Sequence, residues 1–329
     1  MSSILVTGAA GFIGAHLAAR LARMGHTVVG VDNFNDYYAV GLKHGRVESI
    51  LRPAGVVCHA FDLCDEQALQ ELFAVTQPDY VLHLAAQAGV RYSVENPKSY
   101  LQSNLLAFGN ILEASRQHRV KHLVFASSSS VYGSSDKTPF QEDDPTDQPI
   151  SLYASTKKAN EVMAYSYSAI HQLPITGLRL FSVYGPWGRP DMAYFNFTKK
   201  ILLREPLEVF SNGTLLRDFT YIDDVSEAVT RLLFKEQAAV GKVPYEVFNI
   251  GNRRPTSVLD FIRILENLLG VKAILEFLPM QLGDVRITHA GTDKLHKWID
   301  FSPDTQLQTG LSDFVTWYRE WHMHDGAHA

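Results

Sequence analysis

The first 32 residues combine a strand, a glycine-rich turn, a helix and a second strand, and no other feature constrains the fold as much. An apolar run at residues 4–6 leads into TGAAGFIGAHLAARLARMGH, which contains Gly8, Gly11 and Gly14 in a GxxGxxG spacing, and the following run TVVGVD ends in Asp32. Such glycines let the backbone approach a pyrophosphate, which the helix N-terminus binds, and the acid accepts hydrogen bonds from ribose hydroxyls. We predict a dinucleotide site that prefers NAD, because Asp32 would repel the 2′-phosphate of NADP.

Strands and helices continue to alternate after this unit. Strands are expected at residues 56–60, 79–84 and 121–126, with helices at 65–76 and 97–118. The alternation predicts an α/β fold with a doubly wound parallel sheet of the Rossmann type, in which ligands lie beyond the carboxyl ends of the strands. Residues that directly follow strands should therefore gather at one edge of the sheet. They are Gly8, Asp32, Asp62, Ala85 and Ser127.

The pattern becomes less regular after a further strand at residues 175–181. The segment SVYGPWGRPDM, residues 182–192, has two prolines and two glycines and is typical of an active-site loop. We place an NAD-binding domain at residues 1–181 and a smaller, mixed α/β substrate domain at residues 182–329. Parts of the second domain, such as a helix at residues 223–235, are expected to pack back onto the sheet.

Tyr153 and Lys157 form the candidate catalytic pair. They are four residues apart, so they share one face of a helix. A lysine ammonium favours a nearby phenolate and lowers the tyrosine pKa from its ordinary value of about 10, which makes Tyr153 a candidate general base. The serine run at residues 127–130, about 25 residues upstream, can hold a substrate oxygen against this phenol. Four serines in a row leave open which of them does so.

Composition excludes several classes of function. The chain has 329 residues, 46% of them hydrophobic, and a formal net charge of −5, which argues against a protein that coats nucleic acid. We see neither a signal peptide nor an apolar run of the ~18 residues that a membrane span needs, so we expect a cytoplasmic protein. Cys58, Cys64, His59 and His83 have no partners at metal-ligand spacing. We therefore predict buried free thiols, hydrogen-bonded core histidines and no metal site.

Nearly end to end, the chain resembles an extended short-chain dehydrogenase/reductase of the nucleotide-sugar epimerase group. The resemblance rests on TGAAGFIG, HLAAQAGVRYS, SNLLAFGNILEA, SSSSVYG, YxxxK, VYGPWGRPDMA, RDFTYIDDV and GDVR. DNFNDYY, AGVRYS and YGPWGRPDMAYFNFTKKIL are most similar to UDP-glucuronate 4-epimerases. The resemblance implies NAD as cofactor, a UDP-sugar as substrate, epimerisation through a transient 4-keto sugar, and a homodimer paired through the helices at 97–118 and 153–171.

The resemblance also implies roles for individual residues. Tyr153 removes the proton of the sugar's 4-hydroxyl while carbon 4 gives hydride to the nicotinamide, Lys157 bonds the nicotinamide ribose, and Ser128, with Ser129 beside it, bonds the 4-oxygen. The implied cofactor-binding residues are Gly8, Gly11, Phe12, Ile13, Gly14, Asp32, Asn33, Asp62, Leu63, Leu84, Ala85, Ala86, Tyr153 and Lys157. The implied substrate-binding residues are Gln87, Arg91, Ser93, Ser128, Ser182, Arg189, Phe195, Asn196, Arg217 and Arg286.

Two features bear on which reaction is implied. Related 4,6-dehydratases carry an Asp-Glu pair, and related decarboxylases a Glu, where this chain has Ser129 and Ser130, so we expect the reaction to stop at carbon 4. Arg189 is the candidate for a sugar carboxylate, because a guanidinium fork matches that group. Arg217 and Arg286 are the candidates for the diphosphate.

Several alternatives stay open. Arg286 stands where many glucuronate epimerases have Pro, and Ser182 where relatives often have Thr, so UDP-glucose or UDP-N-acetylglucosamine is an alternative substrate. Arg189 is otherwise a solvated loop cation, and Phe195 a packing residue. Alternatives of another class are a non-catalytic NAD-binding sensor, which would usually have lost its Tyr or Lys, and a net dehydrogenase or reductase.

Overall fold

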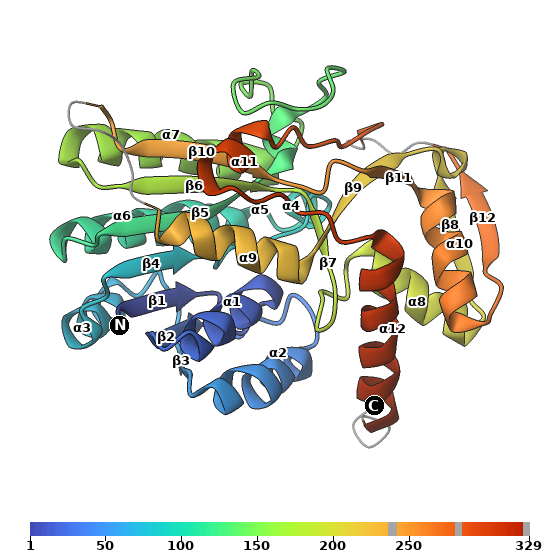
Figure 1. The fold of residues 1–329 in the computed structure, drawn as a ribbon, viewed down its shortest axis with the longest axis horizontal. Helices are drawn as coiled ribbons and strands as arrows, with labels where there is room; N and C mark the ends of the chain where they lie inside the picture. The colour runs from blue at the N-terminus through green and yellow to red at the C-terminus, as the bar shows by residue number, and fades with distance from the viewer. Residues whose placement is uncertain (236–241, 280–284, 325–329) are drawn as a thin grey trace.

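The computed structural model describes residues 1–235, 242–279 and 285–324. Its main feature is a sheet of seven strands, all paired in parallel, in the order β10-β6-β5-β4-β1-β2-β3 (Figure 1). The strands are β1 Ser3–Thr7, β2 Thr27–Asp32, β3 Val57–Ala60, β4 Tyr80–His83, β5 His122–Ser128, β6 Ile175–Leu180 and β10 Tyr245–Ile250. The chain order reverses between β1 and β4, which is where a doubly wound sheet binds its ligand. The predicted fold class is confirmed.

Helices cover both faces of this sheet (Figure 1). α1 (Phe12–Arg23) and α9 (Ile222–Leu233) pack together on one face, whereas α3 (Glu66–Thr76), α6 (Ala107–Gln117) and α7 (Leu152–His171) cover the other. Side chains of successive strand residues point to opposite faces, so neighbours in one strand enter different cores. Leu5 and Val6 of β1 show this, since both are fully inaccessible and each belongs to a different hydrophobic cluster.

The helix expected at residues 97–118 is present but is not regular. It begins as α5 (Pro97–Tyr100), directly after the short α4 (Tyr92–Glu95), and continues through a π-helical stretch at Leu101–Leu106 into α6. Asn104 lies in this stretch. Its side-chain oxygen accepts from Gln87 N at 2.8 Å, and its Nδ2 donates to the Gln87 carbonyl oxygen at 3.1 Å. The wider turn thus ties the helix to the loop that follows β4, at the ligand-binding edge of the sheet.

The remaining elements form a smaller unit beside the sheet (Figure 1). One sheet has the order β11-β9-β7, and β12 pairs with β8 in another. These strands are β7 Ser182–Tyr184, β8 Pro206–Phe210, β9 Leu216–Tyr221, β11 Pro255–Ser257 and β12 Ile274–Leu278. The helices of this unit are α8 Ala193–Leu203, α10 Val258–Leu269 and α12 Leu307–His324. α11 Asp293–Ile299 instead contacts β10 and α9 of the larger unit, and α2 Val40–Arg46 follows β2 in the chain. The prediction of a loop at residues 182–192 is wrong for the first three residues, which form β7 and pair with β9.

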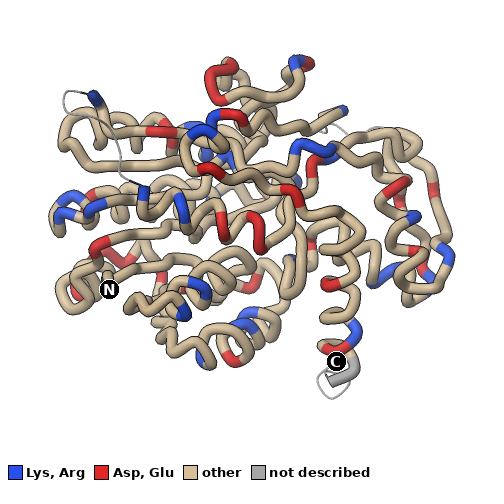
Figure 2. The backbone as a smooth tube through the Cα atoms, viewed as in Figure 1, with Lys and Arg blue, Asp and Glu red and all other residues tan. Residues whose placement is uncertain are grey.

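The division of the chain at residue 182 stays a prediction. After that residue the chain returns to the large sheet through α9, which packs on α1, through β10, which is the edge strand next to β6, and through α11, which contacts β10. Basic and acidic residues are interspersed along the whole described chain (Figure 2). Within the described residues, no helix is long and apolar enough to cross a membrane.

β3 is the opposite edge of the large sheet, and this position corrects two expectations. Cys58 and Cys64 are free, as expected, but they are half-buried, and His59 is exposed. The prediction that Cys58 and His59 are buried is wrong, because an edge strand has a neighbouring strand on one side only. His83, on the interior strand β4, is buried and its Nδ1 lies 2.9 Å from the Thr7 hydroxyl, as predicted for a hydrogen-bonded core histidine.

Candidate active site

A cavity of about 850 Å³ lies beyond the carboxyl ends of the strands. The five residues predicted to follow strands, Gly8, Asp32, Asp62, Ala85 and Ser127, lie in or just after the last residues of strands and all line the cavity, so the prediction that they gather at one edge is confirmed. All the residues predicted to bind the cofactor line the same cavity. The loop that follows β7 closes its other side, through residues that include Arg189 and Asp191.

The glycine-rich turn forms the floor of the cavity at the start of α1. A Cβ at Gly14 would lie 2.1 Å from the carbonyl oxygen of Gly8, and a Cβ at Gly8 would lie 2.7 Å from the Ala85 nitrogen. Gly8 also has a φ of +69°, which favours glycine. Gly11, the N-cap of α1, has no side chain to accept from the first helical N–H groups, which leaves them for an anion such as a diphosphate.

Asp32 lies at the end of β2 and is fixed by the backbone. Its Oδ2 accepts from Ala10 N at 3.1 Å and its Oδ1 from Phe34 N at 2.9 Å. Lys43, a buried residue that sequence reasoning missed, is 4.0 Å from this carboxylate. Farther along the edge, Asp62 accepts from Asn33 Nδ2 at 2.8 Å. A glycine cradle, an uncapped helix N-terminus and an oriented carboxylate are the donor and acceptor set that NAD requires, so the residues fit this cofactor.

Tyr153 and Lys157 enter the cavity from the first turns of α7. The helix begins at Ser151, whose hydroxyl accepts from Ala154 N at 3.1 Å. The two side chains share a face of the helix, as predicted, and both line the cavity. Lys157 is only 4% exposed, and its Nζ donates to the Ala126 carbonyl oxygen at 2.8 Å.

The four serines have different surroundings. Ser127 donates to Glu161 Oε1 at 2.7 Å. The Ser128 hydroxyl donates to the Ser130 hydroxyl at 3.1 Å and accepts from Ser130 N at 3.1 Å, which caps the short 3₁₀ helix Ser129–Tyr132. Ser128 lines the cavity together with Tyr153, and its assignment to the 4-oxygen stays a prediction.

The pKa of Tyr153 differs from the expectation. Burial raises the pKa of this phenol above its ordinary value of 10, whereas the hydrogen bond from Ser128 and the positive charge of Arg189 lower it. Burial also lowers the pKa of Lys157 to about 8. The prediction that Lys157 brings the tyrosine pKa below 10 is thus wrong for the polypeptide alone, because removing the phenolate from water outweighs the favourable charges.

Arg189 is not a solvated loop cation. Its Nε and Nη2 donate to the two carboxylate oxygens of Asp191 at 3.0 and 2.5 Å. Tyr37, from the loop after β2, donates to the same carboxylate at 3.1 Å. Arg189 keeps the pKa of Asp191 below its ordinary value despite burial, so the pair is charged. Asp191 and Tyr37 are cavity residues that sequence reasoning missed, and the closeness of Asp191 to Arg189 in the sequence was the available signal.

The residues predicted to bind the substrate divide into two groups. Those that line the cavity are Gln87, Arg91, Ser128, Ser182, Arg189 and Asn196, together with the predicted catalytic residue Ser129. Ser93, Phe195, Arg217 and Arg286 are not among the lining residues. The predicted set is therefore only partly brought together.

Each of the second group has another environment. The buried Ser93 donates to the Val90 carbonyl oxygen at 2.6 Å, and Phe195 packs against α12, with its ring centroid 5.1 Å from that of Tyr318. Arg217 is directed at the backbone of Arg286, since its Nη1 lies 3.5 Å from the Arg286 carbonyl oxygen. Neither the packing of Phe195 nor this backbone contact is visible in a linear motif.

Comparisons with known proteins agree with this geometry. The model of the NAD dependent epimerase/dehydratase family matches residues 4–251. UDP-glucuronate 4-epimerase 4 of Arabidopsis thaliana is 47% identical over 335 residues, which cover 98% of this chain and 76% of that protein. The crystal structure of UDP-glucuronic acid 4-epimerase from Bacillus cereus, in complex with UDP-glucuronic acid and NAD, has a TM-score of 0.89 at 35% identity and covers 97% of this chain and 99% of that one.

A second solved relative has a different sugar bound. The UDP-glucose 4-epimerase of Thermotoga maritima, with UDP-glucose, has a TM-score of 0.87 at 31% identity, and the match covers 97% of this chain and 99% of that chain. The family model covers well over half of the chain, and the similarity to the Arabidopsis protein extends over almost all of it. The protein belongs to the NAD dependent epimerase/dehydratase family.

Proposed function

We propose that the protein is an NAD-dependent UDP-sugar 4-epimerase that interconverts UDP-glucuronate and UDP-galacturonate. The observation that carries the proposal is the arrangement of Tyr153, Ser128 and Lys157 in the same cavity as the dinucleotide cradle, with Arg189 on the loop that closes it. Ser129 and Ser130 supply no carboxylate for chemistry beyond carbon 4. Relatives named for this reaction, similar over nearly the whole chain, support the choice of sugar.

The glycine turn and Asp32 would hold NAD, which would supply a reversible hydride acceptor for carbon 4 of the sugar. Ser128 holds the 4-oxygen by a hydrogen bond, and Tyr153 takes the proton from that oxygen and later gives it back. Lys157 stabilises the phenolate by its charge and would bind the ribose that carries the nicotinamide. Because no net electron is lost, the cofactor is recycled and the reaction is an isomerisation.

Arg189 is a positively charged side chain in the cavity that can bind the carboxylate of the uronate. A guanidinium has five N–H donors, and Asp191 accepts from two of those of Arg189, so three are left for another acceptor. Asp191 also fixes the fork in one orientation, which favours bidentate binding. Ser182 lies in the same lining. Holding the carboxylate matters because a 4-keto uronate is a β-keto acid and is prone to lose carbon dioxide.

For the diphosphate we keep Arg217 and Arg286 as a proposal and add Arg91. Arg91 lines the cavity, with its guanidinium 5.4 Å from the centroid of the Phe210 ring. The Arg217 side chain reaches the backbone of Arg286, and arginine is suited to binding a doubly charged group. Asn196, also in the lining, is a further candidate.

The second candidate is the same reaction on UDP-glucose or UDP-N-acetylglucosamine. It is favoured by Arg286, which stands where many glucuronate epimerases have Pro, and by the similarity to a UDP-glucose 4-epimerase. Both candidates share the proposed roles of Tyr153 and Lys157. They differ in whether the substrate carries a carboxylate that needs Arg189.

A product assay separates these candidates. Purified protein is given UDP-glucuronate, UDP-glucose or UDP-N-acetylglucosamine with NAD, and the products are identified by chromatography. We expect UDP-galacturonate from UDP-glucuronate and little turnover of the other two. A pentose product would show decarboxylation, accumulation of NADH would show a net dehydrogenase, and retention of NAD without any turnover would show a sensor; each of these results contradicts the proposal.

The substitution Arg189→Gln tests the carboxylate contact. We expect kcat/KM for UDP-glucuronate to fall at least 100-fold, since a charge-assisted contact is worth about 3 kcal/mol. Any residual turnover of UDP-glucose should change much less, because that sugar has no carboxylate. Equal losses on both substrates would show that Arg189 serves the reaction in another way.

We also propose that the protein is a homodimer in which α6 and α7, together with the π-helical stretch before α6, pair with their copies. Apolar side chains on these segments are exposed in the single chain, including Leu106 (54%) and Val162 (59%). Burial of such side chains against a second copy would remove them from water.

A further inference from the structure

Two consecutive residues at the end of β5 each bind one residue of α7. The pairs are Ala126 with Lys157 (2.8 Å) and Ser127 with Glu161 (2.7 Å), and the next residue, Ser128, lines the active-site cavity together with Tyr153. Lys157, Ser128 and Tyr153 are the proposed catalytic side chains. Glu161 lies one helical turn beyond Lys157, and neither the motifs nor the proposed reaction gives it a role.

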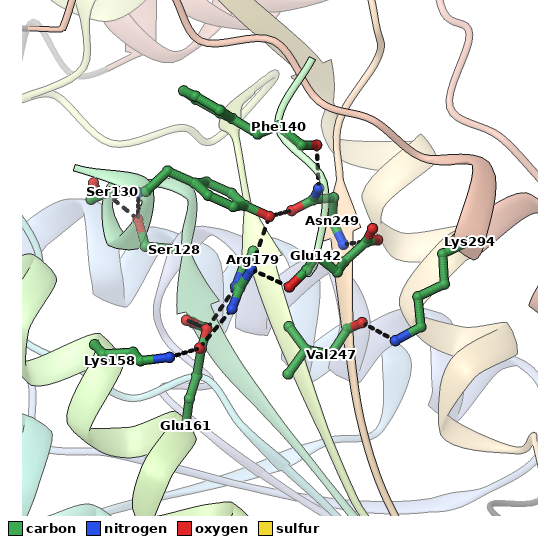
Figure 3. A network of polar contacts seen from close by, with 12 residues as sticks. Ser128, Ser130, Phe140, Glu142, Lys158, Glu161, Arg179, Val247, Asn249 and Lys294 are labelled. Carbon is green, nitrogen blue, oxygen red and sulfur yellow. Dashed lines mark hydrogen bonds and ion pairs between the residues drawn. The ribbon is translucent and has the colours of Figure 1, made fainter. Parts of the chain in front are cut away.

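Glu161 is held by an arginine on the neighbouring strand. Arg179 of β6 donates through Nε and Nη2 to the two carboxylate oxygens, both at 2.9 Å (Figure 3). Arg179 and Ser127 are direct partners in the register of β5 and β6. Glu161 thus contacts two adjacent strands at the same level, and the side chains of the ion pair are only 5% and 4% exposed.

The arginine has further fixed partners. Its Nη1 donates to the Tyr132 hydroxyl and to the Glu142 carbonyl oxygen, both at 3.0 Å. Tyr132 in turn donates to Asn249 of β10 at 2.6 Å. Figure 3 shows the guanidinium between Glu161 and Asn249, with partners on both sides. Arg179 therefore has no freedom to turn away, and neither does the carboxylate that it binds.

Stability alone does not account for this arrangement. A buried ion pair is weak evidence for stability, because apolar residues of similar volume often stabilise a protein equally well. A carboxylate does something that an apolar side chain cannot do: it accepts from Arg179 and Ser127 at the same time. Because Ser127 precedes Ser128 directly, fixing the Ser127 side chain fixes the direction of the next one.

We infer that Glu161 and Arg179 are positioning residues, which hold Ser127 so that the Ser128 hydroxyl stays directed into the cavity that Tyr153 also lines. Neither residue touches the sugar in this account. The inference rests on the proposed function, because the reaction whose rate these residues would affect is the proposed epimerisation. It predicts that the contact between Ser127 and Glu161 affects the rate of the chemical step rather than substrate binding.

The sharpest test compares two variants that each remove one buried hydroxyl contact. Ser127→Ala removes the contact with Glu161 but leaves the ion pair intact, so a buried charge is not exposed. Thr176→Val removes the 2.9 Å contact between Thr176 and His122, which joins the same two strands at their other end. Ser127→Thr keeps a hydroxyl and serves as the rescue variant. Thermal unfolding, kcat and KM are measured for all three.

The positioning role predicts that Ser127→Ala lowers kcat roughly 10-fold or more, since small misplacements at a reacting centre have such effects. KM should change less than 3-fold, Ser127→Thr should restore most of the rate, and Thr176→Val should keep the wild-type kcat. Equal kcat values for Ser127→Ala and Thr176→Val, at similar melting temperatures, would overturn the inference.

Failure of the proposed function can be distinguished from failure of this inference. If the wild-type protein converts none of the three UDP-sugars, the proposed function is wrong whatever the variants do. The inference is then decided by crystal structures of Ser127→Ala and Thr176→Val with NAD. Only Ser127→Ala should displace the Ser128 side chain relative to Tyr153, and an unmoved Ser128 would refute the positioning role.

Discussion

Replacing Lys157 by methionine is expected to abolish turnover and yet to stabilise the fold. Lys157 is 4% exposed in the cofactor-free chain, and among the described residues its ammonium donates to a single acceptor, the Ala126 carbonyl oxygen. No carboxylate is paired with it among the ion pairs of the described residues. A buried ammonium with so little compensation is costly, because water no longer solvates the charge.

The pKa of Lys157 gives the size of the effect. Burial lowers this pKa from its ordinary value of 10.5 to about 8. Each tenfold change in proton affinity corresponds to about 1.4 kcal/mol, so the charged lysine destabilises the folded state by about 3 kcal/mol at pH 7. Methionine has a similar shape but loses a hydrogen bond worth about 1 kcal/mol. The expected net gain is about 2 kcal/mol.

The pH dependence has a definite sign. Below pH 8 the lysine is charged in both the folded and the unfolded chain, and the full penalty applies. Between about pH 8 and 10.5 the folded chain has already lost the proton and the unfolded chain has not, so the penalty decreases as the pH rises. The advantage of Lys157→Met over the wild type should therefore be largest near pH 7 and almost absent near pH 10.

Thermal unfolding of the cofactor-free proteins measures this difference. For 329 residues the unfolding entropy is about 0.7 kcal/mol/K, so about 2 kcal/mol raises the Tm by roughly 3 °C at pH 7. Turnover should fall at least 100-fold in the same variant. A variant less stable than the wild type at pH 7, or a Tm difference that does not change with pH, would refute the assignment of Lys157 as a buried, uncompensated charge.

Three further predictions concern the glycine-rich turn, the Arg189–Asp191 pair and the proposed dimer interface. Gly14→Ala should weaken NAD binding at least 10-fold in a calorimetric titration, because its Cβ would meet the Gly8 carbonyl oxygen, whereas Gly41→Ala, which has open space, should not. Asp191→Asn should move the acid limb of the kcat–pH profile to lower pH, since Asp191 raises the pKa of Tyr153; a limb that stays in place would contradict this. Val162→Glu should yield monomers in sedimentation, and dimers that persist would argue against pairing through α7.

The order of strands and helices could be predicted because it depends on local periodicity. The apolar runs, the turn at Gly8–Gly14 and the four-residue spacing of Tyr153 and Lys157 each fix a local conformation, and parallel pairing then brings their ends to one edge. The same argument correctly brought Asp32, which lies at the end of β2, into the cavity. Local pattern does not give the order of strands in the sheet, so Cys58 on β3 was wrongly taken as buried.

Side-chain partners and burial account for the other errors. Arg189 was predicted to contact the sugar carboxylate, with a solvated loop cation as the alternative; its bonds to Asp191 were not predicted, because that pairing depends on the conformation of the loop. The pKa of Tyr153 depends on desolvation, which a spacing rule does not include. Phe195 contacts α12, more than 100 residues away in the sequence, so its packing role needed the tertiary structure.

The most direct test of the proposed reaction follows the hydrogen on carbon 4. UDP-glucuronate with deuterium at carbon 4 is incubated with the protein and NAD in ordinary water, and the product is examined by mass spectrometry and NMR. Removal and return of the same hydride predicts UDP-galacturonate that keeps its deuterium at carbon 4, with no accumulation of NADH. Loss of the deuterium to water, or its appearance in free NADH, would contradict the account.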